Sequence, residues 1–406
     1  MLSELLQQNP VVITGCGAVT AAGLTVPELW DRACAGRAAA DWLPHRDRAG
    51  RPYAGCAIGA LPDDAPGTRR LDRSTRLGLL AARQALRQAR LEVCPVPARR
   101  LGVVAATSRG PVGQLLEAAQ MPPDRRFRPS LALNAAVAAL SGAISAELAA
   151  EGPCLTVSAT CASSAAALAL AAQQLVLGAA DLMLAGGAEA PLLPLVLGPL
   201  QAMGLLGSHD QPQKVCRPFD VSRNGTVLGE GAGFLALETL ASARRRGVQP
   251  LARLAGWAIA ADTRHRAGLD ETGENLARTL QEAIHLAGLA PAQISHLNTH
   301  GTGTRANDLA EARALRRVFG NAPLCCAATK PVTGHCLGAG AAIEAILAIE
   351  ALRHQTVPPT ANCDQPDPQC ALDLARNQPR PWPIPAAMSV SAGLWGTRAA
   401  LVFTPA

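Results

Sequence analysis

The chain has 406 residues, 49% of them hydrophobic, and a net charge of +6. This length supplies enough apolar surface for two packed domains or for one large two-part α/β unit. Aromatic residues make up only 3% of the chain, which argues against nucleic-acid binding by base stacking. The start of the chain is too polar for a signal peptide, and the most apolar helix candidate, 163–178, is interrupted by Gln173 and Gln174. We therefore expect a cytoplasmic protein that does not cross a membrane.

The first half of the chain alternates strands with helices. Its predicted strands cover 11–14, 101–106, 154–158, 182–185 and 234–238. Its predicted helices cover 26–35, 71–91, 132–150, 163–178 and 239–246. The proline- and arginine-containing segment 107–131 is expected to be a surface loop.

The same alternation restarts near residue 250. Predicted strands cover 325–328, 387–391 and 399–403, and predicted helices cover 273–288, 307–318 and 338–354. Such alternation indicates mainly parallel or mixed sheets covered by helices. Because no proline- or serine-rich linker separates them, the halves 1–248 and 249–406 are expected to pack as one body.

Two glycine-rich segments resemble nucleotide-binding motifs only superficially. Gly15-x-Gly17 lacks the third glycine of a dinucleotide fingerprint, so we interpret it as a tight turn after a strand. The segment 229–233 precedes a strand instead of opening a helix. It is expected to serve close backbone packing near the site.

The twelve cysteines are scattered, mostly in apolar segments, and are expected to be reduced. Cys325, Cys326, His335 and Cys336 lack the paired spacing of a zinc finger or ribbon, so no metal site is predicted. Cys161 stands apart, because it lies between a strand and a small-residue helix. A helix N-terminus lowers the pKa of a thiol, which makes Cys161 the candidate nucleophile.

Three later motifs accompany this cysteine. They are Asn298-Thr-His-Gly-Thr-Gly-Thr304, Thr329-Lys-Pro-Val-Thr-Gly-His-Cys-Leu-Gly338 and Gly393-Leu-Trp-Gly-Thr397. A thiol with two imidazoles, His300 and His335, suits acyl-thioester chemistry, in which imidazole N–H groups stabilise an enolate or oxyanion. Lys330 is one of only two lysines in an arginine-rich chain, which indicates a specific need for its compact head.

Together with the stretch Arg223-Asn-Gly-Thr-Val-Leu-Gly-Glu-Gly-Ala-Gly233, these motifs resemble the β-ketoacyl-acyl carrier protein synthases of the thiolase superfamily. The resemblance runs in order from Val11 to about Phe403. It implies an α/β thiolase-like fold, with two related halves packed as αβαβα layers. It also implies a decarboxylative Claisen condensation of a Cys-bound acyl chain with malonyl-acyl carrier protein, in fatty-acid or type II polyketide biosynthesis.

The resemblance further implies roles for individual residues. Cys161 accepts the acyl group, and His300 and His335 promote decarboxylation. Lys330 forms a charge network with Asp308, Glu311 or Glu344 that orients His335. Thr302 and Thr304 contact the phosphopantetheine arm of the acyl carrier protein, on which the substrates travel, and no bound cofactor is implied. The N–H groups of Cys161 and Leu394 form an oxyanion hole.

The chain departs from the family pattern near its C-terminus. Leu394 stands at the gating phenylalanine, Trp395 replaces a glycine, and Thr226 replaces a common aromatic residue. The segment 304–308 is similar to synthases of aryl-polyene and other type II polyketide pathways.

Two kinds of protein partner are expected. Arg69, Arg70, Arg125 and Arg126 are candidate docking residues for an acidic carrier protein. The resemblance implies a homodimer, or a heterodimer with a chain-length factor, through helix 132–150 and strand 154–158.

Three other functions are compatible with parts of the pattern. The chain could be a chain-length-factor-like partner subunit, but such subunits usually lack the nucleophile. An acyltransferase or hydrolase on the same scaffold would keep the cysteine without needing both histidines. A biosynthetic thiolase would carry Asn-Glu at the position of HGTGT and a second cysteine near residue 391.

Overall fold

The computed structural model describes residues 2–61, 68–93, 95–263 and 270–406. The predicted docking residue Arg69 lies in a described turn, but its side chain is outside the described part of the structure.

Two five-stranded sets with the same topology organise the fold. The first contains β1 (Val11–Thr20), β4 (Leu101–Ala106), β5 (Cys154–Val157), β6 (Leu182–Glu189) and β8 (Gly231–Thr239). The second contains β9 (Ala252–Ala261), β10 (His296–Asn298), β11 (Cys325–Ala327), β14 (Ala387–Ala392) and β15 (Thr397–Thr404). In each set the strands lie side by side in the order third, second, fourth, fifth, first.

The strand directions also repeat. The second, third and fourth strands of each set run parallel, and the fifth pairs antiparallel with the fourth and the first. The two sets meet through a short antiparallel ladder, in which Val12 and Ile13 face Arg253 and Ala252. Each half of the chain therefore builds a five-stranded sheet of the same topology.

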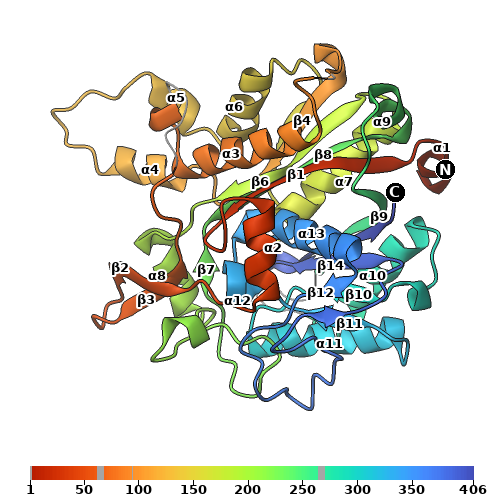
Figure 1. The fold of residues 1–406 in the computed structure, drawn as a ribbon. Coiled ribbons are helices and arrows are strands. Elements are labelled where there is room, and N and C mark those ends of the chain that lie inside the picture. The colour runs from red at the N-terminus through yellow and green to blue at the C-terminus, as the bar shows by residue number, and fades with distance from the viewer. Residues whose placement is uncertain (1, 62–67, 94, 264–269) are drawn as a thin grey trace.

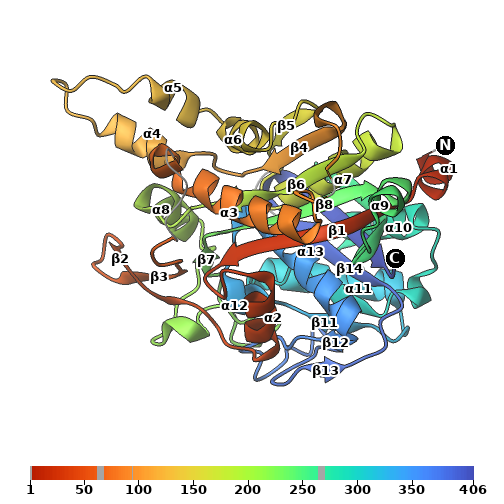
Figure 2. The same cartoon turned by 45° about the horizontal axis from the view of Figure 1, so that its top comes forward.

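Helices cover both faces of each sheet, which gives the αβαβα layering that the sequence predicted (Figures 1 and 2). The outer face of the first sheet carries α3 (Arg73–Gln88) and α6 (Ala139–Leu148). The outer face of the second carries α10 (Glu274–Leu286) and α11 (Arg305–Phe319). Between the sheets lie α7 (Ser163–Val176) and α13 (Leu337–His354).

The remaining elements decorate this core. The helices are α1 (Leu2–Gln8), α2 (Val26–Cys34), α4 (Val112–Ala119), α5 (Ser130–Asn134), α8 (Pro194–Ala202), α9 (Leu240–Arg246) and α12 (Lys330–Thr333). The strands are β2 (Asp41–Arg46), β3 (Pro52–Cys56), β7 (Leu228–Gly229), β12 (Thr356–Val357) and β13 (Arg380–Pro381).

The middle layer is built from small residues. Helix α7 reads SSAAALALAAQQLV, and α13 begins LGAGAAIEA. All side chains from Leu337 to Leu352 are buried. Small side chains let two sheets approach the same pair of helices closely, so both helices form part of the main hydrophobic core.

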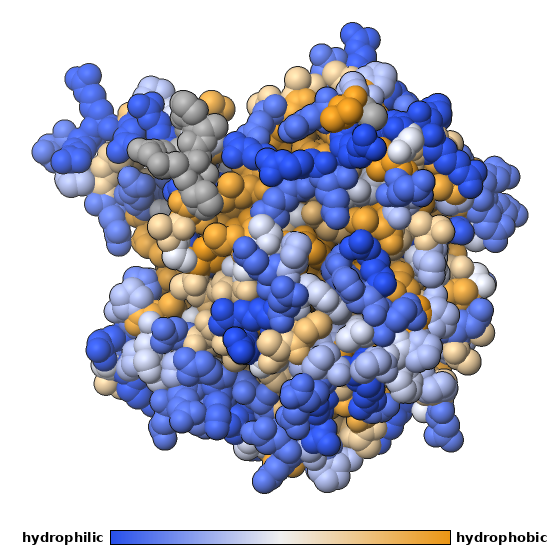
Figure 3. All heavy atoms as spheres, in the orientation of Figure 1, coloured by the Kyte–Doolittle hydropathy of each residue, from blue (hydrophilic) through white to orange (hydrophobic). Residues whose placement is uncertain are grey.

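The segment between β4 and β5 differs from its prediction. Helix α4 lies within the stretch expected to be a loop, and α5 and α6 replace a single helix 132–150. The segment from α4 to α5 projects from the body of the molecule (Figure 1). Its tip is hydrophilic, whereas apolar residues gather in the band between α3 and α2 (Figure 3).

The interpretation of Gly15 and Gly17 as a turn was wrong, because both lie inside β1. A Cβ at Gly17 would lie 1.9 Å from the carbonyl oxygen of Ala81, and one at Gly15 would lie 2.0 Å from that of Ala85. These glycines let α3 pack directly on β1. Gly256 does the same in the second half, where a Cβ would lie 2.3 Å from the carbonyl oxygen of Ala283 on α10.

None of the helices in the described ranges is long and apolar enough to span a bilayer.

We expect Gly17→Val to lower the free energy of unfolding by about 1 to 3 kcal/mol, because the backbone of α3 must move to admit the side chain. Gly256→Val should have a similar effect at the equivalent place in the second half. Thermal unfolding measures both. Gly59→Ala is the matched control, since Gly59 has open space around its Cβ position. Equal melting temperatures for all three variants would contradict this packing account.

Candidate active site

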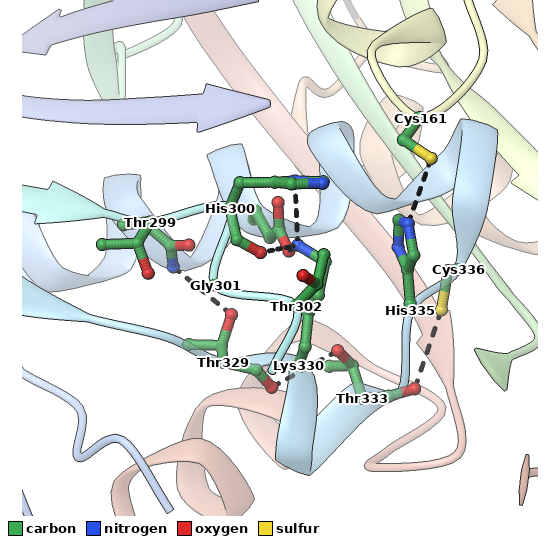
Figure 4. Close-up of polar contacts among 12 residues, drawn as sticks. Cys161, Thr299, His300, Gly301, Thr302, Thr329, Lys330, Thr333, His335 and Cys336 are labelled. Atoms are coloured by element: carbon green, nitrogen blue, oxygen red, sulfur yellow. Dashed lines mark hydrogen bonds and ion pairs between the residues drawn. The ribbon is translucent and has the colours of Figure 1, made fainter. Parts of the chain in front are cut away.

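Four chain segments meet between the two sheets at the N-termini of the middle helices. Cys161 lies just before α7, and His300 follows β10. Lys330 begins α12, and His335 lies between α12 and α13. Figure 4 shows the side chains of Cys161 and His335 pointing toward one another, with His300 beside Lys330.

A tight turn presents Cys161. Thr160 before it has a φ of 49°, a left-handed conformation that is strained for a β-branched residue. Ser163 holds the turn, because its Oγ accepts from the N–H of Ala159 at 2.8 Å and donates to the carbonyl of Thr160 at 2.6 Å. The Cys161 Sγ then lies 3.1 Å from Nε2 of His335.

The glycine-rich stretch before β8 holds His335 in place, as the sequence predicted for close packing. The N–H of His335 donates to the carbonyl of Val227 at 2.7 Å. A Cβ at Gly229 would lie 2.4 Å from the carbonyl oxygen of Thr333, so only glycine allows this approach. The rings of His300 and His335 meet edge to face, with centroids 5.4 Å apart.

Lys330 is buried and orients His300, whereas the prediction was that it orients His335. Its ammonium forms an ion pair with Glu344 and donates to the backbone carbonyl of His300 at 2.5 Å. It also lies 3.3 Å from Nδ1 of His300. The difference arises because α12 turns Lys330 toward the end of β10, while His335 points the other way toward Cys161.

The other two carboxylates predicted for this network accept hydrogen bonds from backbone N–H groups instead of pairing with Lys330. Glu311 accepts from the N–H groups of His300 and Gly301, at 2.6 and 2.9 Å. Asp308 accepts from the N–H groups of Gly303 and Phe219, at 3.2 and 2.8 Å. Of the three candidate partners, Glu344 alone forms the expected ion pair with Lys330.

Burial sets the protonation of the site. Burial raises the pKa of the Cys161 thiol to about 12, although the charge of Lys330 opposes the shift. The expectation of a lowered thiol pKa was therefore wrong, because desolvation outweighs the favourable charges near the helix start. Burial, followed by the charge of Lys330, lowers the pKa of both His300 and His335 well below 6.5. At neutral pH a neutral thiol thus faces a neutral imidazole.

A cavity of about 390 Å³ contains these groups. The predicted residues Thr302, Thr304, Leu394 and Trp395 line it, together with Cys161, His300 and His335. Thr226 also lines it. Leu200, Leu205, Leu206, Leu228 and Leu337 supply an apolar wall. The cavity can therefore hold an extended apolar chain next to the thiol.

A glycine at each end of the loop after β14 allows the loop to pack closely against its neighbours. A Cβ at Gly393 would lie 1.9 Å from Oγ1 of Thr160, and one at Gly396 would lie 2.0 Å from the carbonyl oxygen of Asp262. Between them Trp395 adopts a φ of 61° and remains 65% exposed. Trp395, at a position where the family resemblance implies glycine, thus adopts a left-handed backbone and adds a large aromatic group at the cavity edge.

Sequence reasoning missed Glu189, which lies at the end of β6 and is fully buried. It accepts hydrogen bonds from Oγ1 of Thr107 and from the N–H groups of Ser108, Arg109 and Gly338, at 2.7 to 3.0 Å. Burial raises its pKa to about 7. Glu189 therefore ties the loop after β4 to the start of α13, and a charged residue ending an apolar strand was the available signal.

The predicted docking residues lie outside the cavity. Arg70, Arg125 and Arg126 are exposed, and Arg70 shares a small hollow with Arg128 beside α4. Across the part of the chain that is described, no cluster of three or more His, Cys, Asp or Glu residues is arranged to hold a metal ion.

Comparison with known proteins places this arrangement in a family. The β-ketoacyl synthase N-terminal domain matches residues 8–243, and the β-ketoacyl synthase C-terminal domain matches residues 251–364. The 3-oxoacyl-[acyl-carrier-protein] synthase 2 of Staphylococcus aureus (strain COL) is 34% identical, over 98% of each chain. That of Coxiella burnetii is 32% identical, over 98% of this chain and 99% of the relative.

Solved structures agree with the sequence relatives. A ketosynthase complex with its type II polyketide acyl-carrier protein (AntDE:AntF), bound to the hexaketide, superposes with a TM-score of 0.91 at 29% identity. The ishigamide ketosynthase/chain length factor gives 0.90, also at 29% identity. Each covers 98% of this chain and 99% of the compared chain. The chain belongs to the β-ketoacyl synthase family, and it is an enzyme of the acyltransferase class.

The neutral histidines predict the pH dependence of turnover. A group with a lowered pKa becomes charged only when the pH falls below that pKa, so both imidazoles remain neutral from pH 8 down to pH 6. We therefore expect the condensation rate not to fall as the pH is lowered from 8 to 6. The double variant Lys330→Met/Glu344→Gln removes the nearby charge without leaving an unpaired buried ion. Because the charge of Lys330 lowers the pKa of both histidines, the acidic limb of the variant's pH–rate profile should move to higher pH. A wild-type rate that falls tenfold between pH 7 and pH 6 would contradict the assignment.

Proposed function

We propose that this β-ketoacyl synthase joins an acyl chain held on Cys161 to a malonyl unit delivered by an acyl carrier protein. The observation that carries the proposal is the 3.1 Å contact between Cys161 Sγ and His335 Nε2, in the same cavity as His300. The finer pathway, fatty acid or type II polyketide, follows from the acyl chain that Cys161 accepts.

In the first half-reaction His335 acts as a general base. Its neutral Nε2 takes the thiol proton as Cys161 attacks the thioester carbonyl of the carrier-bound acyl group. A new carbon–sulfur bond forms to Cys161, and the bond to the pantetheine sulfur breaks. The proton passes from His335 to the departing thiolate. The N–H groups of Cys161 and Leu394 are the proposed donors to the transient oxyanion.

In the second half-reaction the malonyl unit loses CO₂ and its electron pair forms an enolate. The enolate carbon attacks the acyl carbonyl, the bond from the acyl group to Cys161 breaks, and the departing thiolate takes up one proton from solvent. Lys330 has only donors, so its contact with Nδ1 of His300 makes that nitrogen an acceptor and leaves the ring proton on Nε2. His300 is therefore set to donate to the enolate oxygen.

The tautomer of His335, unlike that of His300, is not fixed by a hydrogen bond from any residue that the structure describes. Its Nδ1 has no hydrogen-bond partner among the described residues. Since nothing there fixes the tautomer, His335 can accept a proton at Nε2 in the first half-reaction and donate from Nε2 in the second. The two histidines thus have distinct roles within one pair.

The carrier-protein arm is proposed to enter along Thr302 and Thr304, whose hydroxyls lie 2.9 Å apart at the cavity wall. The acidic carrier protein itself is proposed to dock on Arg69, Arg70, Arg125 and Arg126. The exposed positions of Arg70, Arg125 and Arg126 support this assignment. This chemistry uses side chains and carrier-bound substrates alone, without a further cofactor. All the described cysteines are free, which supports a reducing, cytoplasmic setting.

The central test follows acyl transfer by intact mass. Incubation with acyl-acyl carrier protein should add one acyl group to the wild type, and added malonyl-acyl carrier protein should convert it to a β-ketoacyl product. Cys161→Ala should abolish acylation, while Cys336→Ala should retain it, because the buried Cys336 thiol faces the carbonyls of Thr333 and Gly334 and does not line the cavity.

Failure of wild-type acylation would refute the enzyme assignment. Acylation without condensation would indicate an acyltransferase. The chain-length-factor alternative is not favoured, because the thiol and both imidazoles lie together in one cavity.

We further propose that β5 forms a subunit interface, with a second copy of this chain or with a chain-length factor. It lies at the end of its sheet, and Leu155 is 44% exposed there. Leu133 and Val137, before α6, are also exposed. An uncovered edge strand beside exposed apolar residues favours pairing with another chain.

Size-exclusion chromatography with light scattering tests the homodimer. The wild type should elute at twice the chain mass of 41.8 kDa. Leu155→Arg should shift it toward the monomer, because a charge would be buried at the edge. Leu177→Arg, at an exposed leucine following α7, is the control and should leave the mass unchanged. A monomeric wild type that assembles only with a second protein would replace the homodimer with a heterodimer.

A further inference from the structure

The cavity around Cys161 has an unusual charge balance. Arg109 and Arg305 line it, and no Asp or Glu belongs to its lining among the described residues. His300 and His335 are neutral, so they do not offset these charges. A cavity walled by leucines that carries only positive charge favours a ligand with an apolar body and an anionic group.

Arg109 stands on a rigid support. It follows β4 in a turn whose backbone is fixed by Glu189, which accepts from the N–H groups of Ser108 and Arg109. Gly110 closes the turn with a φ of 66°, and its N–H donates to Oγ1 of Thr107. The side chain of Arg109 is exposed, and within the described ranges no carboxylate forms an ion pair with its guanidinium. A preorganised cation is therefore available to a ligand.

Arg109 also acts near the nucleophile. Its charge is among those that lower the pKa of Cys161 against burial, so it lies within electrostatic reach of the thiol. The same turn leads into Val112, which packs in one apolar cluster with Cys161, Leu192 and Leu205. The segment that carries Arg109 thus packs against the leucines of the cavity wall, whereas Arg305 follows Thr304 of the HGTGT motif.

Two anionic groups of the reaction fit Arg109 poorly. The malonyl carboxylate loses its charge as CO₂ leaves, so an arginine bound to it would stabilise the ground state more than the transition state and slow the reaction. The phosphate of the carrier arm is separated from the thioester by the whole pantetheine chain, and its proposed path runs along Thr302 and Thr304. The anionic group that remains is one on the acyl chain itself.

We propose that Arg109 selects acyl chains that end in a carboxylate, so that Cys161 receives the half-thioester of a dicarboxylic acid in preference to a methyl-ended chain. The guanidinium binds the distal carboxylate while the leucine wall covers the methylene groups. This specificity rests on the proposed acyl transfer to Cys161.

The test compares two acyl groups of matched length on the same acyl carrier protein, hexanoyl and adipoyl. Loading of Cys161 is followed by intact mass. The wild type should load adipoyl faster. Arg109→Leu should reduce the ratio of adipoyl to hexanoyl loading by about 10- to 100-fold, the range expected for a lost charge-assisted hydrogen bond. Arg109→Lys should retain part of the preference.

Arg305→Leu is the matched control. It removes the other cavity arginine and should slow both acyl groups alike, leaving the ratio unchanged. A wild type that loads hexanoyl as fast as adipoyl, or an Arg109→Leu variant with an unchanged ratio, would overturn the role of Arg109 while leaving acyl transfer intact. Absence of loading with either chain would refute the proposed function itself.

Discussion

The close packing of α7 and α13 between the two sheets is the constraint on which the site depends. Cys161 lies at the start of α7 and His335 at the start of α13, so the distance between thiol and imidazole follows from how these helices sit side by side. Alanine, serine and glycine allow both sheets to reach them. Glu189 stabilises this arrangement, because its carboxylate at the end of β6 accepts a hydrogen bond from the N–H of Gly338 in the first turn of α13. A larger side chain in this layer would separate the groups that react.

The same burial that positions the groups also determines their chemistry. A thiol and two imidazoles removed from water favour their neutral forms, and the buried Lys330 ammonium has its counter-charge in Glu344. The nucleophile is thus generated during the reaction by proton transfer. This arrangement leaves the resting thiol unreactive and lets one fixed geometry serve both half-reactions.

The motifs predicted much of the site, because Cys161, His300, His335 and Lys330 stand in local patterns of glycine and threonine. The alternation of strands and helices predicted the layered α/β fold. Pairings between distant segments were not predictable, which is why Lys330 was assigned to the wrong histidine. Gly15 and Gly17 were misread because they are needed for a tertiary contact, the close approach of α3 to β1. The thiol pKa was misjudged since burial cannot be read from a local motif. The division at residues 248 and 249 and the roles of individual site residues stay predictions.

The central claim is that Cys161 rests as a neutral thiol hydrogen-bonded to a neutral His335. The pH dependence of Cys161 alkylation by iodoacetamide, followed by mass spectrometry, tests it most directly. The account predicts that alkylation stays slow through pH 8.5, the ordinary thiol pKa, and rises only at higher pH, with no plateau near neutrality. It also predicts that His335→Ala does not lower the midpoint. A plateau of fast alkylation extending below pH 7, lost on His335→Ala, would reveal a thiolate–imidazolium pair and contradict the account.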